Sequence, residues 1–357
     1  MPGQLVRISL GKEENPSSFP SSSGSRDDDQ DSSHRLTALP ILILNVHERC
    51  NCRCLMCDIW RREEGRELAP DDIARHRESI QRLGVRQVVL TGGEPLLHSR
   101  LSAICSLLHE CNATVTLLTT GLLLKKRAEL VAFAVDEVIL SLDGPEEIHD
   151  AVRRVKSAFQ LIRDGVRAVR RLQPEMPIHA RCTVQRTNHT LLRRTVRASR
   201  VLGLSSISFL AADVTSQAFN RDQLWSETRQ DEIALTRCEV SALEEEMELL
   251  IREHSEDIAS KYIVERPEKL RRIVRHFKAH LGETYAEAPR CNAPWVSAVI
   301  GVDGSVRPCF FHPNVGSIAN MSLGQALNSS EAQAFRANLD IAKNPICRRC
   351  VCSLHYR

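Results

Sequence analysis

Four cysteines lie within eight residues in the run CNCRCLMC, residues 50–57, directly after the apolar stretch 39–46. Thiolates at this density select zinc, copper(I) or an iron–sulfur cluster. The spacing Cys50-x3-Cys54-x2-Cys57 supplies three ligands from one loop and leaves a fourth coordination position open. A structural zinc site is normally closed by four protein ligands, whereas an open position is typical of a catalytic metal centre. The run therefore favours a catalytic centre over a structural one.

The composition restricts the compartment and the class of partner. The chain has 357 residues, 13 cysteines and a formal net charge of +3, so its charge indicates neither a nucleic-acid nor a membrane partner. Residues 1–36 contain no apolar signal core, and no apolar run elsewhere reaches membrane length. Clustered thiols without an export signal are more often metal ligands than disulfides. We therefore expect a cytoplasmic, reducing environment.

The chain divides by composition into four segments. Residues 1–36 are rich in serine and acidic residues, and such a segment buries too little apolar surface to fold. It is predicted to be a disordered tail, followed by a domain over 37–215, a helical linker over 216–288 and a small cysteine-containing domain over 289–357. The arginine-rich part of the linker, 266–280, is interpreted as a solvated helix face rather than a nucleic-acid patch.

Short apolar runs alternate with stretches of helical periodicity from residue 39 onward. One helix is predicted to begin at Pro70 and to end at Gly84. Strand–helix alternation predicts an α/β fold with a parallel sheet, and six units suit a partial (β/α)6 TIM-like barrel better than an eight-fold one. In such a barrel the chemistry lies at the carboxyl ends of the strands, where the CNCRCLMC run begins. The predicted strands are Leu39–Val46, Gln87–Leu90, Thr114–Thr119, Glu137–Leu142, Ile178–Val184 and Ser206–Leu210.

Polar loops follow two of the other strands. In the run TGGEP (91–95), paired glycines allow a backbone to approach a ligand closely, and Glu94 can accept a hydrogen bond from an ammonium group. In the run SLDG (141–144), Ser141 and Asp143 share one side of the chain and can bond ribose hydroxyls. The alternatives are a tight turn for the first loop and an Asx-turn at a strand end for the second. Arg153 can pair with a carboxylate, or it can be a solvated charge at a helix start.

These motifs, in this order, resemble the radical S-adenosylmethionine (SAM) superfamily over roughly residues 36–214. The resemblance implies that Cys50, Cys54 and Cys57 bind a [4Fe-4S] cluster whose fourth iron takes SAM. It further implies that SAM is cleaved reductively to a 5′-deoxyadenosyl radical, which abstracts hydrogen from a substrate. The family usually has an aromatic residue where this chain has Met56, and Cys52 lies outside the ligand spacing. The implied SAM-binding residues are Gly92, Gly93, Glu94, Ser141, Asp143 and Arg153.

A second group of cysteines lies near the end of the sequence, at positions 291, 309, 347, 350 and 352. Residues 298–302 and 306–310 are predicted to form a β-hairpin around the Asp303-Gly304 turn. The pair Cys347-x2-Cys350 is by itself compatible with a zinc ribbon. Free buried cysteines would explain one or two of these residues but not all five.

Following a radical SAM domain, this group resembles the auxiliary-cluster module called SPASM, and more closely its shortened form, the twitch domain. The resemblance implies one further [4Fe-4S] cluster held by Cys291, Cys309, Cys347 and Cys350, with Cys352 as a reserve ligand. A cluster fully ligated by protein cannot bind substrate, so we expect it to transfer electrons.

Two functional hypotheses follow for the chain as an enzyme. The first is an oxidoreductase that oxidises a small molecule, such as a sugar-like alcohol, by two electrons; the second is a SPASM-type maturase that oxidises or crosslinks a peptide. A redox-neutral reaction and a non-enzymatic iron–sulfur or zinc scaffold are further alternatives. Oxidation requires a base, for which His312 is a weak candidate. The resemblance also implies a flavodoxin- or ferredoxin-type electron donor.

Overall fold

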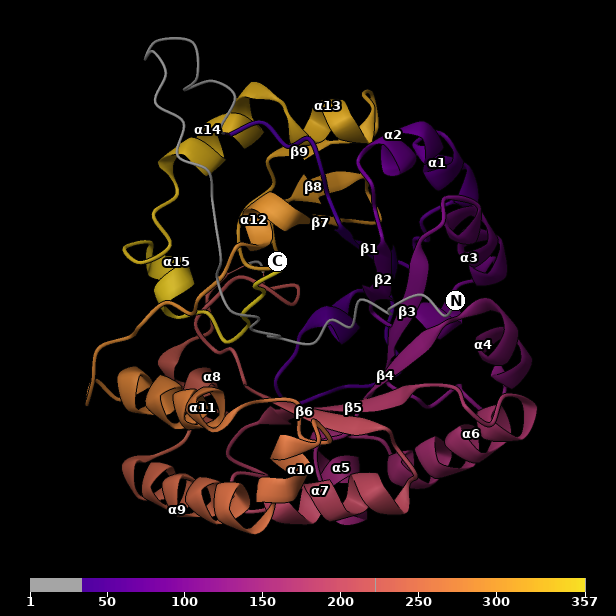
Figure 1. Ribbon diagram of the computed structural model, residues 1–357. Helices are drawn as coiled ribbons and strands as arrows, with labels where there is room; N and C mark the ends of the chain where they lie inside the picture. Colours follow the sequence, from indigo (N-terminus) through magenta and orange to yellow (C-terminus); the bar gives the residue numbers. More distant parts are fainter. Residues whose placement is uncertain (1–33, 222, 357) are drawn as a thin grey trace.

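The computed structural model describes residues 34–221 and 223–356, so most of the predicted N-terminal tail lies outside the described residues. Within them, nine strands form one sheet in the order β6-β5-β4-β3-β2-β1-β7-β8-β9 (Figure 1). Strands β6 through β7 run parallel, and β8 and β9 extend the sheet antiparallel to their neighbours. The strands are β1 (Ile41–His47), β2 (Gln87–Gly92), β3 (Thr114–Thr119), β4 (Glu137–Ser141), β5 (Ile178–Val184), β6 (Ser206–Ala211), β7 (Ser297–Ile300), β8 (Ser305–Arg307) and β9 (Gly316–Ser317).

Helices cover the outer face of the curved sheet, and the C-terminal segment lies across its open side (Figure 1). This arrangement confirms the predicted partial barrel, because each of the first five strands is followed by at least one helix before the next strand. The helices are α1 (Pro70–Ala74), α2 (Arg77–Arg82), α3 (Leu101–Glu110), α4 (Ala128–Ala134), α5 (Glu146–Arg153), α6 (Ala158–Leu172), α7 (Leu192–Val201), α8 (Glu227–Asp231), α9 (Arg237–Glu253), α10 (Ser255–Ala259), α11 (Pro267–His280), α12 (Ala293–Val296), α13 (Leu323–Leu327), α14 (Ser330–Asn338) and α15 (Pro345–Arg348), with the 3-10 turns η1 (Ile59–Arg61) and η2 (Pro95–Leu97).

The strand alternation separates two apolar regions. Leu42 and Leu44 of β1 face outward into the large core between sheet and helices. Ile41 and Ile43 face the barrel interior, where they pack with Val89 and Val299 in a small separate cluster. Successive side chains of a strand point to opposite faces of the sheet, so each strand has one side packed against the helices and one side facing the barrel interior. The interior side is the one that a ligand can reach.

Polar side chains close one end of the barrel interior by bonding to one another. Gln87 Nε2 donates to Thr116 Oγ1 at 2.9 Å, and His179 Nε2 lies 3.2 Å from Glu137 Oε1. These residues occupy the amino-terminal halves of β2 to β5. The carboxyl-terminal end of the barrel is left for the loops that carry the cysteines.

Two later segments complete the barrel. The stretch predicted to be a linker, 216–288, forms α8 to α11, and Leu243 of α9 and Phe277 of α11 are buried in the same core as the barrel helices. β7 from the cysteine-containing C-terminal segment pairs with β1, so this segment is joined to the barrel through the sheet. In the described part of the chain, no helix has the length and apolar character needed to cross a membrane.

One predicted helix differs from the structure. The single helix expected from Pro70 to Gly84 is two short helices, α1 and α2. The chain leaves helical geometry at His76, where ψ is 6° and the side chain is buried. Gly84 follows the second helix with a φ of +62°, which fits its predicted role as a terminator.

Candidate functional site

The cysteine loop begins directly after β1, at the carboxyl edge of the barrel. Its backbone is fixed to α5, because Arg53 N donates to Arg153 O at 3.2 Å and Leu55 N donates to Val152 O at 3.1 Å. Cys54 is buried, whereas Cys50 and Cys57 are partly exposed. The backbone of the loop is therefore held from the α5 side.

A buried ion pair lies beside Cys54. Arg153 Nη2 is 2.6 Å from Asp143 Oδ2, and Arg153 Nη1 is 3.4 Å from Cys54 Sγ. Hydrogen bonding from Cys52, aided by the positive charge of Arg153, lowers the pKa of Cys54 to about 6 against the opposing effect of burial. Thiolates are the form in which cysteines bind metals, so this surrounding prepares Cys54 as a ligand. Cys52 itself lies between Cys50 and Cys54, and hydrogen bonds with these two cysteines raise its pKa.

The ion pair gives Asp143 and Arg153 a different setting from the one that the sequence suggested. The other carboxylate oxygen of Asp143 accepts from Thr183 N at 3.0 Å, and the residue is fully buried. Both side chains thus bond to protein groups around the cysteine loop. Their predicted contacts to SAM stay a prediction, and the observed contacts support a positioning role.

A second buried ion pair holds the far end of the loop, and no pattern in the sequence indicated it. Arg221 Nη1 lies 2.8 Å from Asp213 Oδ2, and Arg221 Nη2 donates to Met56 O at 3.2 Å. Trp225 stacks on the guanidinium at 3.8 Å. Arg221 follows β6 by ten residues in an irregular segment, where no periodicity marks it as buried. The cysteine loop is therefore held at both ends by an arginine that is neutralised by an aspartate.

Met56 stands where the family usually has an aromatic residue. Leu55 and Met56 pack against a small apolar cluster that includes Val214 and Ile233, and Trp225 packs on the same cluster. An aromatic ring is thus present beside this position, supplied from a distant part of the chain.

The two glycines after β2 bring this loop against the cysteine loop. Gly93 N donates to His47 O at 2.7 Å, and a Cβ on Gly93 would lie 2.0 Å from Arg49 O. Gly92 has a φ of +131°, and a Cβ there would lie 2.4 Å from His47 O. Both glycines thus lie against the protein backbone at the end of β1 and just after it, and their predicted approach to SAM stays a prediction.

The carboxylate of Glu94 is buried and accepts four hydrogen bonds. Oε1 accepts from Leu96 N at 2.9 Å and from Thr119 Oγ1 at 2.7 Å; Oε2 accepts from Thr120 N at 2.7 Å and from Thr120 Oγ1 at 2.6 Å. Thr120 Oγ1 also lies 3.0 Å from Asn51 Oδ1 in the cysteine loop. Glu94 thus joins the β2 loop, the end of β3 and the cysteine loop, and its predicted bond to the SAM amino group would be added to this set.

Substituting Gly93 tests this junction. We expect Gly93→Ala to displace the start of the cysteine loop, because backbone atoms cannot move aside for a Cβ as a flexible side chain can. Iron content after anaerobic reconstitution should fall by about the share of one cluster, with the auxiliary site filled. Gly324→Ala is the matched control, because Gly324 also lacks a positive φ and a Cβ there would meet only Ser79 Oγ, at 3.9 Å. Equal iron in Gly93→Ala and wild type would contradict the proposed junction.

The second cysteine group converges at one cavity. All five members, at positions 291, 309, 347, 350 and 352, line a cavity of about 140 Å³. His312 lines it as well, with Nε2 3.3 Å from Cys347 Sγ and its ring edge-on to Phe335. Burial raises the pKa of Cys309 to about 12 and that of Cys347 to about 11.

A cluster and a single metal ion make different demands on the two cysteine sets. Within the described residues, no three His, Cys, Asp or Glu side chains are placed to hold one metal ion together. A [4Fe-4S] cluster binds each thiolate through a different iron, so it needs the thiolates farther apart than a single zinc ion does. The predicted ligand sets are three cysteines in the first loop and four at the second cavity, with Cys352 as a reserve, and they stay predictions.

The same cavity contains charged residues that the sequence did not identify as functional. It is lined by Ile41, Ile43, Val89 and Leu118 from the inner face of the strands, together with Arg181, Glu265 and Lys269. Glu265 Oε2 accepts from Phe209 N at 2.9 Å, whereas Oε1 has no hydrogen-bond partner and lies 3.9 Å from Lys269 Nζ. Burial raises the pKa of Glu265 and lowers that of Lys269.

Ser141 is the remaining predicted site residue. It ends β4 and is in register with Arg181 of β5, whose side chain reaches the cavity. Ser141 is partly exposed, so its predicted contact to SAM is compatible with its place at the carboxyl edge. The structure thus brings the first cysteine loop, the TGGEP loop and Ser141 to one edge of the barrel.

Comparisons with known proteins agree with both cysteine sets. The model of the radical SAM superfamily matches residues 44–190, and the model of the SPASM iron–sulfur cluster-binding domain matches residues 291–351. A pre-heme d1 synthase of Dinoroseobacter shibae is 31% identical over 141 residues, which are 38% of this chain and 35% of that protein. A probable GTP 3′,8-cyclase of Methanococcus maripaludis is 36% identical over 104 residues, 28% of this chain and 35% of that protein. The matches therefore span about a third of these relatives.

Solved structures share the fold over most of the chain. Streptococcus suis SuiB bound to SAM superposes with a TM-score of 0.61 and 13% identity, covering 90% of this chain and 74% of SuiB. The protein anSMEcpe with bound SAM gives a TM-score of 0.63 and 16% identity, covering 88% of this chain and 93% of anSMEcpe. These structures confirm the fold, and the two family matches confirm the resemblance drawn from the motifs. The chain therefore carries a radical SAM domain, which implies a [4Fe-4S] cluster and SAM, and a C-terminal SPASM-type iron–sulfur cluster-binding domain, which implies auxiliary cluster binding.

Proposed function

We propose that this protein is a radical SAM oxidoreductase that acts on a substrate held in the barrel interior. It removes one hydrogen atom, one proton and one electron from that substrate, which is a two-electron oxidation. Cys50, Cys54 and Cys57 would hold the SAM-binding cluster, and Cys291, Cys309, Cys347 and Cys350 the auxiliary cluster. When bound, these groups supply hydrogen-atom abstraction at one end of the interior and one-electron acceptance at the other. The protein's own task is to bind the substrate, exclude water and take up a proton.

One observation carries this proposal: the inner faces of the barrel strands and the auxiliary cysteines line one cavity. A substrate in the barrel interior would then contact both the SAM side and the auxiliary side. Residues Ile41, Ile43 and Phe310 give this cavity an apolar lining, which excludes water. A protein that only stored clusters would have no need for such a shared interior space.

Glu265 is the base that the proposed oxidation requires. One of its oxygens is fixed by the β6 backbone, which orients the other oxygen toward Lys269 and the cavity. Burial raises its pKa, which strengthens it as a proton acceptor. His312, the base suggested by the sequence, lines the same cavity but has its Nε2 directed at Cys347 Sγ. Glu265 therefore has the freer proton-accepting atom.

A peptide substrate is the second candidate. SuiB has been solved with its precursor peptide SuiA, and anSMEcpe with the peptide Cp18Cys, and both superpose on this chain with a TM-score of 0.59. Their sequence identity of 13% and 17% supports the fold, and the peptide comes to this chain only as a proposal. A charged pair at the end of an apolar cavity suits one oxidised side chain of a peptide as well as a small polar alcohol.

Isotope transfer tests the proposed function. The reconstituted protein is incubated with SAM, a reductant and each member of a panel of deuterated polyols and peptides with deuterated side chains. We expect deuterium in 5′-deoxyadenosine and a product that has lost that deuterium and one further hydrogen atom relative to its substrate. Deuterium transfer with a product in which one hydrogen has replaced the lost deuterium would show a redox-neutral reaction instead. No 5′-deoxyadenosine with an intact SAM-binding cluster would favour a scaffold.

A further inference from the structure

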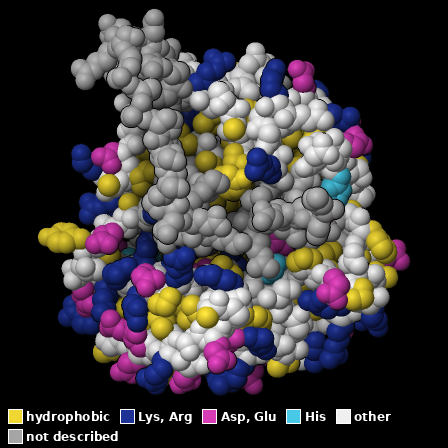
Figure 2. All heavy atoms as spheres, viewed as in Figure 1, with side chains coloured by type: hydrophobic (Ala, Val, Ile, Leu, Met, Phe, Trp, Pro, Cys, Tyr) yellow, Lys and Arg dark blue, Asp and Glu magenta, His cyan; other side chains and the backbone are white. Residues whose placement is uncertain are grey.

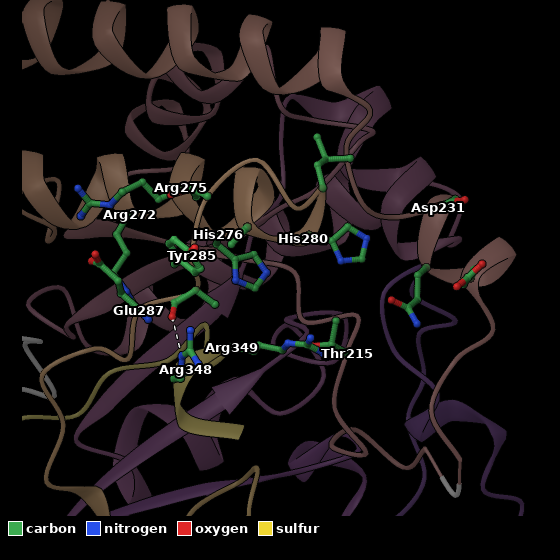
Figure 3. A pocket seen from close by; sticks show the side chains of 16 residues that line it. Thr215, Asp231, Arg272, Arg275, His276, His280, Tyr285, Glu287, Arg348 and Arg349 are labelled. Atoms are coloured by element: carbon green, nitrogen blue, oxygen red, sulfur yellow. Dashed lines mark hydrogen bonds between the residues drawn. The ribbon is translucent and has the colours of Figure 1, made fainter. Parts of the chain in front are cut away.

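Arg272 of α11 lies between the auxiliary cysteines and the protein surface. Its Nη2 donates to the carbonyl oxygen of Cys350 at 2.6 Å, and Cys350 lines the cavity of the barrel interior. Arg272 also lines an outer pocket of about 430 Å³, where Arg275, Arg348 and Arg349 gather with it while Asp231 lies at the opposite end (Figure 3). The side chain therefore separates the auxiliary cysteines from this outer, arginine-lined pocket.

The charge of Arg272 has no carboxylate to balance it. In the described residues, no aspartate or glutamate oxygen lies within ion-pair distance of its guanidinium, although most of the side chain is withdrawn from water. Burial lowers its pKa, and Cys350, Cys352 and Cys291 would oppose this effect when their thiols are ionised as cluster ligands. A buried charge is costly unless an opposite charge compensates it. The thiol set is the compensation that this structure offers.

Other cations on the same helix are neutralised in the ordinary way. Arg271 Nε lies 2.7 Å from Glu248 Oε1, and Lys278 Nζ lies 2.7 Å from Glu244 Oε2, both across to α9. The surface over α9 and α11 accordingly shows interspersed basic and acidic side chains (Figure 2). This face agrees with the interpretation of 266–280 as a solvated helix face. Arg272 is an exception on that helix, because it turns toward the cysteines.

We propose that Arg272 is a positioning residue that raises the reduction potential of the auxiliary cluster by placing an uncompensated positive charge beside its ligands. The four-thiolate set fits such a cluster by number and by convergence on one cavity. A nearby cation favours the reduced, more negative form, and protein charges near a cluster are known determinants of its potential. The cluster is thereby a better acceptor for the electron that the proposed oxidation releases. This inference rests on the proposed auxiliary site.

Potentiometry monitored by electron paramagnetic resonance tests the inference without a substrate. Arg272→Gln removes the charge and keeps an amide donor. We expect the ratio of reduced to oxidised auxiliary cluster, poised at the wild-type midpoint, to fall about tenfold, or about 59 mV for a one-electron couple. Arg272→Lys should stay close to wild type because it retains the charge. Arg271→Gln is the matched control, since its partner Glu248 lies away from the cysteines.

The SAM-binding cluster serves as an internal reference, because its signal responds to added SAM and its potential should not change in any variant. An unchanged auxiliary potential in Arg272→Gln would overturn the inference and leave the proposed function standing. So would an equal shift in Arg272→Gln and Arg272→Lys, which would indicate a structural effect. If Arg272→Gln binds less iron, the inference is decided by Arg272→Lys. A lysine variant with full iron content and the wild-type auxiliary potential supports an effect of the positive charge, and a shifted potential overturns it. A wild-type protein without an auxiliary-cluster signal would instead refute the auxiliary site itself.

Discussion

Replacing Arg153 with methionine is expected to lower the free energy of unfolding by about 3–5 kcal/mol, because Asp143 would be left as an unpaired buried charge. The change also removes the guanidinium beside Cys54 Sγ, so reconstituted protein should lose iron from the SAM-binding site. The unfolding free energy is measured by denaturant titration of the iron-free protein, which separates folding from cluster binding. Iron content of the reconstituted protein gives the second effect.

Two variants distinguish the ion pair from a general effect of substitution. Arg154→Met changes the adjacent, exposed arginine and should alter stability by less than about 0.5 kcal/mol. The double variant Arg153→Met with Asp143→Asn should recover part of the loss, because it removes the uncompensated carboxylate. A loss below about 1 kcal/mol in Arg153→Met would contradict the positioning role assigned to the pair.

The second large effect is expected at Glu265. Glu265→Gln keeps an oxygen that can accept from Phe209 N but removes the proton-accepting carboxylate, so formation of the oxidised product should fall by about 10²- to 10⁴-fold. Deuterium transfer into 5′-deoxyadenosine should change by less than about threefold, because hydrogen abstraction precedes proton uptake. The measurement is the ratio of oxidised product to 5′-deoxyadenosine for the substrate found by isotope transfer.

Glu268→Gln is the matched control for this prediction, since Glu268 is exposed in the first turn of α11, three residues after Glu265. His312→Ala provides the competing case. If product formation fell with His312→Ala and persisted with Glu265→Gln, the sequence-based candidate would be the base and the assignment to Glu265 would be wrong.

The strands and the cysteines could be predicted because their signals are local. Thr114–Thr119 and Ile178–Val184 were predicted with the bounds that the structure has, since each is a short apolar run between clear breaks. The hairpin around Asp303-Gly304 was predicted from its turn and is observed as β7 and β8. Metal-binding cysteines can be predicted in the same way, because their spacing alone indicates a metal site.

The contacts between distant polar residues could not be predicted in the same way. Asp143 and Arg153 were each assigned to a cofactor, whereas the structure pairs them with each other. A sequence shows that a charge exists but not which opposite charge the fold brings to it. Arg221 and Asp213 were missed for the same reason.

One missed feature did leave a trace in the sequence. Four polar residues recur at spacings of four, three and four, which places them along one side of α11 and the residues just before it. They are Glu265, Lys269, Arg272 and His276. Within a run so rich in charge, that stripe was interpreted as solvated surface. The buried stripe of Leu270, Ile273, Val274 and Phe277 beside it was the sign that this side lies close to the interior.

Iron quantitation with Mössbauer spectroscopy is the most direct test of two cluster sites at one barrel interior. Anaerobically reconstituted protein should contain about eight iron atoms per chain, all in [4Fe-4S] clusters. The double variant Cys347→Ala with Cys350→Ala should retain about four, and so should the double variant Cys54→Ala with Cys57→Ala. About four iron atoms in the wild type, accompanied by zinc at the C-terminal cysteines, would contradict the auxiliary cluster and with it the proposed oxidation.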